Sequence, residues 1–133
     1  MPISAHSHIL DLFTLAIADG FVAPEELTLI YEKGQQLGLS TAAIDEVIQN
    51  PHRVSFRAPE SLLEAIPRLY DLACVVVTDD RIDPREVSVL RSYAQRFGIQ
   101  PELVDQIVAA LVDEVRAGTQ RDELVAKLAQ ELA

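Results

Sequence analysis

Apolar residues recur every three or four positions along most of this chain, which is the spacing of an amphipathic α-helix. Leu27, Ile30 and Leu37 show it in one segment, and similar series follow later. No segment alternates between apolar and polar residues as a half-buried strand would. The one β-like run, Val75–Val77, continues a helical series that begins at Leu62. The pattern therefore predicts an all-α protein.

Prolines and glycines mark where the predicted helices begin and end. Proline suits the first turn of a helix, where a missing N–H costs nothing, and we expect Pro59 to lie in such a turn. Gly38 and Gly98 stand where a left-handed residue ends a helix, and Thr119 is expected to cap the last one. The predicted helices span about 4–18, 24–38, 41–49, 59–78, 84–98, 101–116 and 120–132.

The sequence matches itself at an offset of 60 residues, because Ile9–Ile48 aligns with Leu69–Val108 without a gap. This predicts a single domain over residues 1–133, built from two pseudo-symmetric three-helix repeats at about 4–50 and 59–116. A linker at 51–58 joins them, and a seventh helix follows. Since the first helix of each repeat is apolar nearly all round, we expect these two helices to pack together at the centre. The identical pairs are Asp11/Asp71, Leu12/Leu72, Asp19/Asp79, Pro24/Pro84, Glu26/Glu86, Gln35/Gln95, Gly38/Gly98 and Asp45/Asp105.

Composition narrows the classes of partner. The 133 residues include 11 Lys and Arg against 21 Asp and Glu, a formal charge of −10, and 49% are apolar. That is enough for one core, and the negative charge argues against nucleic acid or an anionic membrane surface as partner. Cys74 is the only cysteine, and no apolar run is long enough to insert into a bilayer. With no basic leader at the N-terminus, we expect a cytoplasmic protein, either a monomer or a weak dimer.

Each repeat carries an acidic turn between its first two helices, at residues 19–26 and 79–86. Carboxylates are the ligands that hard divalent cations prefer, so these turns are candidate sites for Ca²⁺, Mg²⁺, Mn²⁺ or Zn²⁺. An EF-hand is excluded because apolar residues such as Leu15 and Val75 stand where its first ligands belong. The candidate metal ligands are Asp19, Glu26, Asp79, Asp80, Asp83 and Glu86.

The same acids also fit a role without any metal. Asp83–Glu86 has the spacing of a capping box, in which Asp83 accepts from the Glu86 amide and Glu86 reaches back to the cap residue. Glu26 holds the same position in the first repeat. Gly20 would supply a positive φ in the turn between the helices. Helix capping and cation binding both remain open for these turns.

The repeated Asp-Gly-x-Val-x-x-x-Glu turn, followed by Leu37–Leu39, resembles the TerB-like domains of tellurite-resistance proteins and DnaJ-like co-chaperones. The resemblance covers about Ile9–Val112. It implies an all-helical fold of two related halves, with Asp19, Glu26, Asp79 and Glu86 as metal ligands and a role in stress resistance. Asp80 replaces the motif's glycine in the second repeat.

The favoured hypothesis is a non-enzymatic interaction module that docks a protein partner which the sequence does not identify. One alternative is a purely structural adaptor without metal. A second alternative is a metal-assisted hydrolase using Asp79, Asp80, Asp83 and Glu86, although no nucleophile or base joins these acids. The sequence names no catalytic residue and no cofactor beyond a divalent cation. His6 and His8 do not share a helical face, so we expect no joint role for them.

Overall fold

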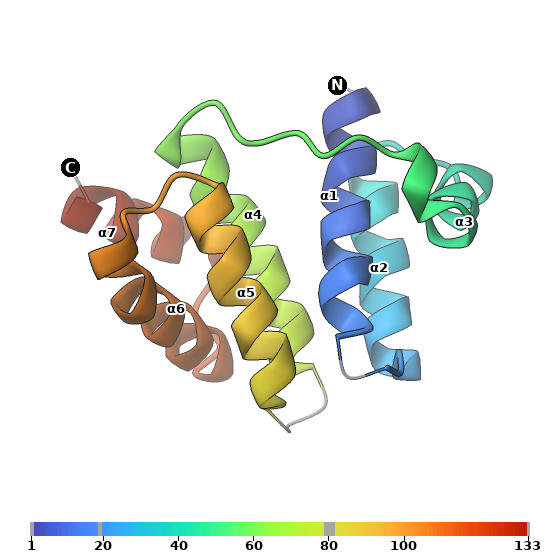
Figure 1. Cartoon of the computed structure of the whole chain (residues 1–133). Helices are drawn as coiled ribbons and strands as arrows, with labels where there is room; N and C mark the ends of the chain where they lie inside the picture. The colour runs from blue at the N-terminus through green and yellow to red at the C-terminus, as the bar shows by residue number, and fades with distance from the viewer. Residues whose placement is uncertain (1, 19, 79–81, 133) are drawn as a thin grey trace.

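The computed structural model describes residues 2–18, 20–78 and 82–132, and within these ranges it contains seven α-helices, one 3-10 helix and no strand (Figure 1). This confirms the predicted compact all-α domain. The helices are α1 (Pro2–Ala16), α2 (Pro24–Gln36), α3 (Thr41–Gln49), η1 (Pro51–Arg53), α4 (Leu62–Val77), α5 (Pro84–Arg96), α6 (Pro101–Arg116) and α7 (Arg121–Leu132).

The helix ends follow local signals. The Ser40 hydroxyl accepts from the Ala43 amide at 3.1 Å and starts α3. Gly38 has a φ of 91°, which a glycine adopts without steric cost, and its amide donates to the Gln35 carbonyl at 3.0 Å. The predicted glycine stop is thus confirmed, and Gly98 ends α5 in the same way with a φ of 99°.

Two predicted boundaries are wrong. Pro59 precedes α4 instead of lying in its first turn, because the Ser61 hydroxyl accepts from the Glu64 amide at 3.3 Å and starts the helix there. Thr119 is not the residue before α7. Its hydroxyl donates to Glu114 at 2.8 Å, while the Gln120 carbonyl accepts the first bond of α7.

Helices α1 and α4 pack against each other at the centre, as the sequence predicted. In Figure 1, α2 and α3 lie on the side of α1, whereas α5, α6 and α7 lie on the side of α4. The fully buried Leu12, Leu15, Leu69 and Leu72 of the two central helices belong to one continuous apolar core.

The linker crosses over one end of the molecule from α3 to α4 and passes the N-terminal part of α1 (Figure 1). The Arg57 amide donates to the Ser7 hydroxyl, and the Arg68 guanidinium donates to the Arg57 carbonyl, both at 2.9 Å. Phe56 packs on the aromatic rings of Tyr93 and Phe97 in α5 and just beyond it. The linker is therefore fixed from both halves of the chain.

None of the helices in the described part of the chain is long and apolar enough to span a lipid bilayer.

Candidate functional site

Three of the six acids predicted as metal ligands, Asp19, Asp79 and Asp80, lie outside the described residues. Glu26 and Glu86 are almost fully buried, with 3% of each exposed. A carboxylate so buried needs partners inside the protein, because desolvation of an unpaired charge is costly.

Glu26 has the helix-start partner that the capping alternative predicts. Its Oε1 accepts from the Ala23 amide at 3.0 Å, and Ala23 has the extended backbone of a residue that precedes a helix. The predicted capping role of Glu26 is confirmed. One carboxylate oxygen is consequently engaged with the protein's own backbone.

Asp83 is the cap residue of α5, as predicted. Its carboxylate accepts from the Arg85 amide at 2.8 Å, one residue before the Glu86 amide predicted as donor. The Arg85 guanidinium lies 3.0 Å from the same carboxylate. A divalent cation at Asp83 would thus compete with a guanidinium already in place. Counting only the residues that the structure describes, no group of three or more His, Cys, Asp and Glu is placed to hold a metal ion.

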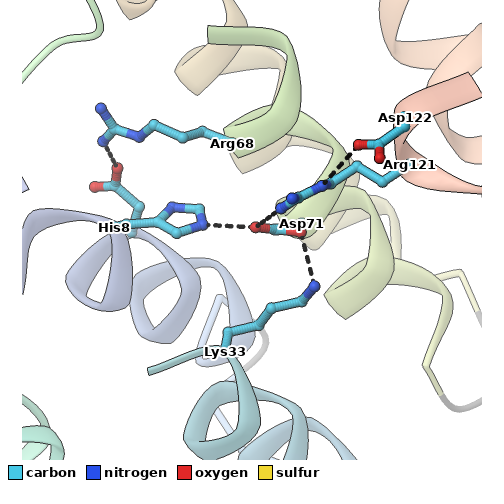
Figure 2. Close-up of polar contacts among 7 residues, drawn as sticks. His8, Lys33, Arg68, Asp71, Arg121 and Asp122 are labelled. Carbon is cyan, nitrogen blue, oxygen red and sulfur yellow. Dashed lines mark hydrogen bonds and ion pairs between the residues drawn. The ribbon is translucent and has the colours of Figure 1, made fainter. Parts of the chain in front are cut away.

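A second group of charges, which the sequence did not predict, lies between the two central helices (Figure 2). At its centre is Asp71 of α4, which is 4% exposed. Its Oδ2 is 2.9 Å from His8 Nε2 of α1, and its Oδ1 is 3.1 Å from Lys33 Nζ of α2. Arg121 of α7 approaches to 3.9 Å. One buried carboxylate therefore joins four helices.

Asp11 of α1 forms the companion pair. The Arg68 guanidinium of α4 donates to Asp11 Oδ2 at 2.8 Å, and the side chain of Asp11 is 1% exposed. Phe97 places its ring 4.6 Å below the guanidinium carbon of Arg68.

The two pairs are reciprocal in the numbering of the repeat. Asp11 and Asp71 are 60 residues apart, and so are their partners, His8 and Arg68. Each aspartate binds the partner that comes from the opposite helix. Lys33, which binds Asp71, stands at the position equivalent to Tyr93.

The two aspartates differ in their electrostatics. Burial raises the pKa of Asp71, but the hydrogen bond from His8 and the charge of Lys33 outweigh this, so the pKa lies below its usual 3.8. Burial also raises the pKa of Asp11, and there it prevails over the attraction of Arg68, so the pKa lies above 3.8. Asp71 is thus the better-stabilised anion. Asp11 and Asp71 are buried within the α1–α4 contact, whereas the Arg121 side chain at its edge is 47% exposed.

Cys74 lies near Asp71 on α4, and burial raises the pKa of its thiol to about 11. Since the thiolate is the reactive form, this shift disfavours Cys74 as a nucleophile at neutral pH.

The sequence did carry a signal for the cluster. Asp11 and Asp71 are acids within the most apolar helices, and they are identical in both repeats. Their partners could not be predicted, because His8 and Asp71 are 63 residues apart and meet only through tertiary packing.

A pocket of about 500 Å³ lies between α1 and the linker, and two arginines and a serine are among the residues that line it. No functional role was predicted for its residues. The lining residues are His6, Arg53, Val54, Ser55 and Arg57.

The chain matches no protein-family model, no curated protein and no solved structure.

Proposed function

We propose that this chain is a non-enzymatic helical module of the TerB-like kind, which docks another protein in a stress-response assembly. The repeated turn motif and the reciprocal pairing across α1 and α4 support the TerB-like part of the proposal. Duplication of an ancestral half would place equivalent residues in such crossed contacts.

Exposed apolar side chains around the first acidic turn carry the docking part of the proposal. Ile17, Phe21 and Leu27 are 41%, 66% and 37% exposed and follow one another around the α1–α2 turn. Clustered exposed apolar side chains mark protein-binding surfaces. The equivalent of Phe21 in the second repeat is Arg81, so the first repeat offers the more apolar turn.

The contacts of the acids favour capping over a resident cation as their primary role. Glu26 is engaged with the Ala23 amide, and Asp83 with the Arg85 amide. Weak cation binding, where it occurs, belongs to the second turn, because Asp79, Asp80, Asp83 and Glu86 are concentrated there. If no cation binds, the module is the purely structural adaptor. No contact in the described residues favours the hydrolase alternative.

Phe21→Ser tests the docking surface, with Leu63→Ser as the matched control, because Leu63 is also exposed, at 68%, but lies at the start of α4. Affinity capture from the native host should recover the same proteins with wild type and Leu63→Ser, and lose one of them with Phe21→Ser. Equal recovery by all three would contradict docking at this turn.

A titration tests whether the second acidic turn binds a divalent cation. Backbone amide shifts are followed while Ca²⁺, Mg²⁺ or Zn²⁺ is added. Shifts confined to residues 79–86 that disappear in Asp79→Asn would establish binding at the second turn. Absence of shifts at millimolar ion would leave the adaptor without metal.

A further inference from the structure

The pocket between α1 and the linker is built mainly from the linker itself. Arg53, Val54, Ser55 and Arg57 form one wall, and His6 from the second turn of α1 faces them. Figure 1 shows the linker passing beside this end of α1. Its volume of about 500 Å³ is in the range of small-molecule sites, which typically measure roughly 300–1,000 Å³.

Exposure alternates along the linker. Arg53, Ser55 and Arg57 are exposed, whereas the intervening Val54 and Phe56 are half-buried and pack against the core. Arg53 ends the 3-10 helix η1, and Val54 after it has an extended backbone. Two guanidinium groups and a hydroxyl line the pocket together with Val54.

This part of the linker is held rigidly. The Arg57 backbone is fixed through its amide by Ser7 and through its carbonyl by Arg68. The Phe56 ring is covered by the Arg96 guanidinium at 3.8 Å from the ring centroid. A site that is already ordered loses little conformational entropy when a ligand binds.

The charge of this part of the linker contrasts with that of the whole chain, which is −10. Within the described part of the chain the Arg57 side chain has no ion pair, and only its backbone is used by the fold. Arg53 pairs with Glu46 at 3.1 Å, but both side chains are more than half exposed. Exposed ion pairs of this kind are weak, so a multiply charged ligand can displace Glu46.

From this geometry we propose that the pocket binds a small molecule carrying an oxyanion of two or more charges, of the phosphate class. Arg53 and Arg57 supply the charge and the paired N–H donors that phosphate oxygens accept. Ser55 adds a hydroxyl donor, and His6 of α1 also lines the pocket.

Isothermal titration of the full chain with inorganic pyrophosphate tests the proposal, with acetate as the singly charged comparison. Arg57→Gln should weaken pyrophosphate binding about tenfold or more, as expected when a charge-assisted hydrogen bond is lost. Arg116→Gln in α6 is the matched control. Arg116→Gln changes the net charge by the same amount as Arg57→Gln, at an exposed site on another helix. The affinity of this variant for pyrophosphate should stay within about twofold of wild type, because exposed charges at a distance are screened.

Glu46→Gln provides a test in the opposite direction. Freed from its ion pair, Arg53 should bind pyrophosphate about two- to fivefold more tightly, and this gain should disappear in Glu46→Gln/Arg53→Gln. Circular dichroism confirms that each variant is folded. The proposal is overturned if neither wild type nor Glu46→Gln binds pyrophosphate at millimolar concentration. It is also overturned if Arg116→Gln weakens binding as much as Arg57→Gln, or if acetate binds equally well. None of these results bears on docking at Phe21.

Discussion

Gly34 shows how one residue sets the distance between three helices. It lies inside α2, where glycine normally costs about 1 kcal/mol relative to alanine. A Cβ at this position would lie 2.5 Å from Ile44 Cδ1 of α3 and 3.4 Å from Ile9 Cδ1 of α1. The glycine thus permits a close approach of α3. The second repeat has Ala94 at the equivalent place.

Gly34→Ala should therefore destabilise the protein although it favours the helix. We expect the free energy of unfolding in urea to fall by about 1–2 kcal/mol, because overpacking outweighs the gain in helix propensity. Ile44→Val removes the nearest methyl group. It should cost less in the Gly34→Ala background than in wild type, and equal costs would show that the two sites do not clash.

Glu26→Ala removes the acceptor for the Ala23 amide and should lower the free energy of unfolding by about 1 kcal/mol, the usual effect of losing a helix cap. Glu26→Gln keeps an oxygen in place and should cost less. Urea unfolding of both variants checks this, and an equal loss would assign the role of Glu26 to its charge rather than to the cap.

Residues that act locally were predictable, whereas those that act across the fold were not. The cap of Glu26 and the stop at Gly38 follow from their neighbours in sequence. The role of Gly34 depends on where α3 packs, which no pattern within α2 encodes.

At the scale of elements, the contact between α1 and α4 combines a wide apolar surface with two buried carboxylates. Asp71 has three basic neighbours, His8, Lys33 and Arg121, whereas Asp11 is paired with Arg68. Buried ion pairs are costly to break, because removing one partner leaves the other buried and unpaired.

Asp71→Asn should destabilise the protein by about 3 kcal/mol at neutral pH, since it leaves Lys33 without a counter-charge and removes the carboxylate that binds His8. Asp11→Asn should cost less, because burial already disfavours the ionised form of Asp11. Urea unfolding of the two variants under the same conditions decides the order. A larger loss for Asp11→Asn would contradict the assignment of Asp71 as the better-stabilised anion.

The pH dependence of the free energy of unfolding also distinguishes Asp71 from Asp11. The folded pKa of Asp71 is below 3.8, so its stabilisation is complete above that value and is lost as the pH falls through the folded pKa. The folded pKa of Asp11 is above 3.8, so acid relieves a penalty there instead. Between neutral pH and about pH 2, wild type should lose more stability than Asp71→Asn. Identical slopes in urea titrations would show that Asp71 does not contribute.

Element boundaries depend on competition between signals that lie close together. Pro59 and Ser61 both suit the start of α4, and the helix begins after Ser61 because its hydroxyl satisfies the Glu64 amide. The order of helices and their central pair followed from apolar periodicity. The buried ion pairs of Asp11 and Asp71 between these two helices could not be predicted from that periodicity, because they form only when the helices pack together.

For the whole molecule, contacts repeat at the offset seen in the sequence. Tyr31 donates to Asp45 in the first half, and Arg91 binds Asp105 at 2.7 Å at the equivalent positions of the second half. Together with the crossed pairs of Asp11 and Asp71, these contacts give a physical reason for the identity of both aspartate pairs.

The linker is held by side chains of both halves, and Phe56 is its main apolar anchor. The Phe56 ring lies 6.3 Å from the Tyr93 ring and 6.1 Å from the Phe97 ring, while Arg96 covers its face. Ser55, immediately before it, is exposed. Ser55 and Phe56 are adjacent in the linker but differ in packing, so Ser55 serves as a control for Phe56.

Phe56→Ala should lower the free energy of unfolding by about 1–3 kcal/mol, less than the loss for a fully buried aromatic ring because Phe56 is only half-buried. Ser55→Ala should stay within about 0.5 kcal/mol of wild type. Because Phe56 anchors the linker directly before Arg57, Phe56→Ala should weaken pyrophosphate binding while the helical content stays unchanged. Urea unfolding and calorimetric titration measure the two effects. If both variants lost the same small amount of stability, the halves would be held together by α1 and α4 alone, and the linker would serve only as a connection.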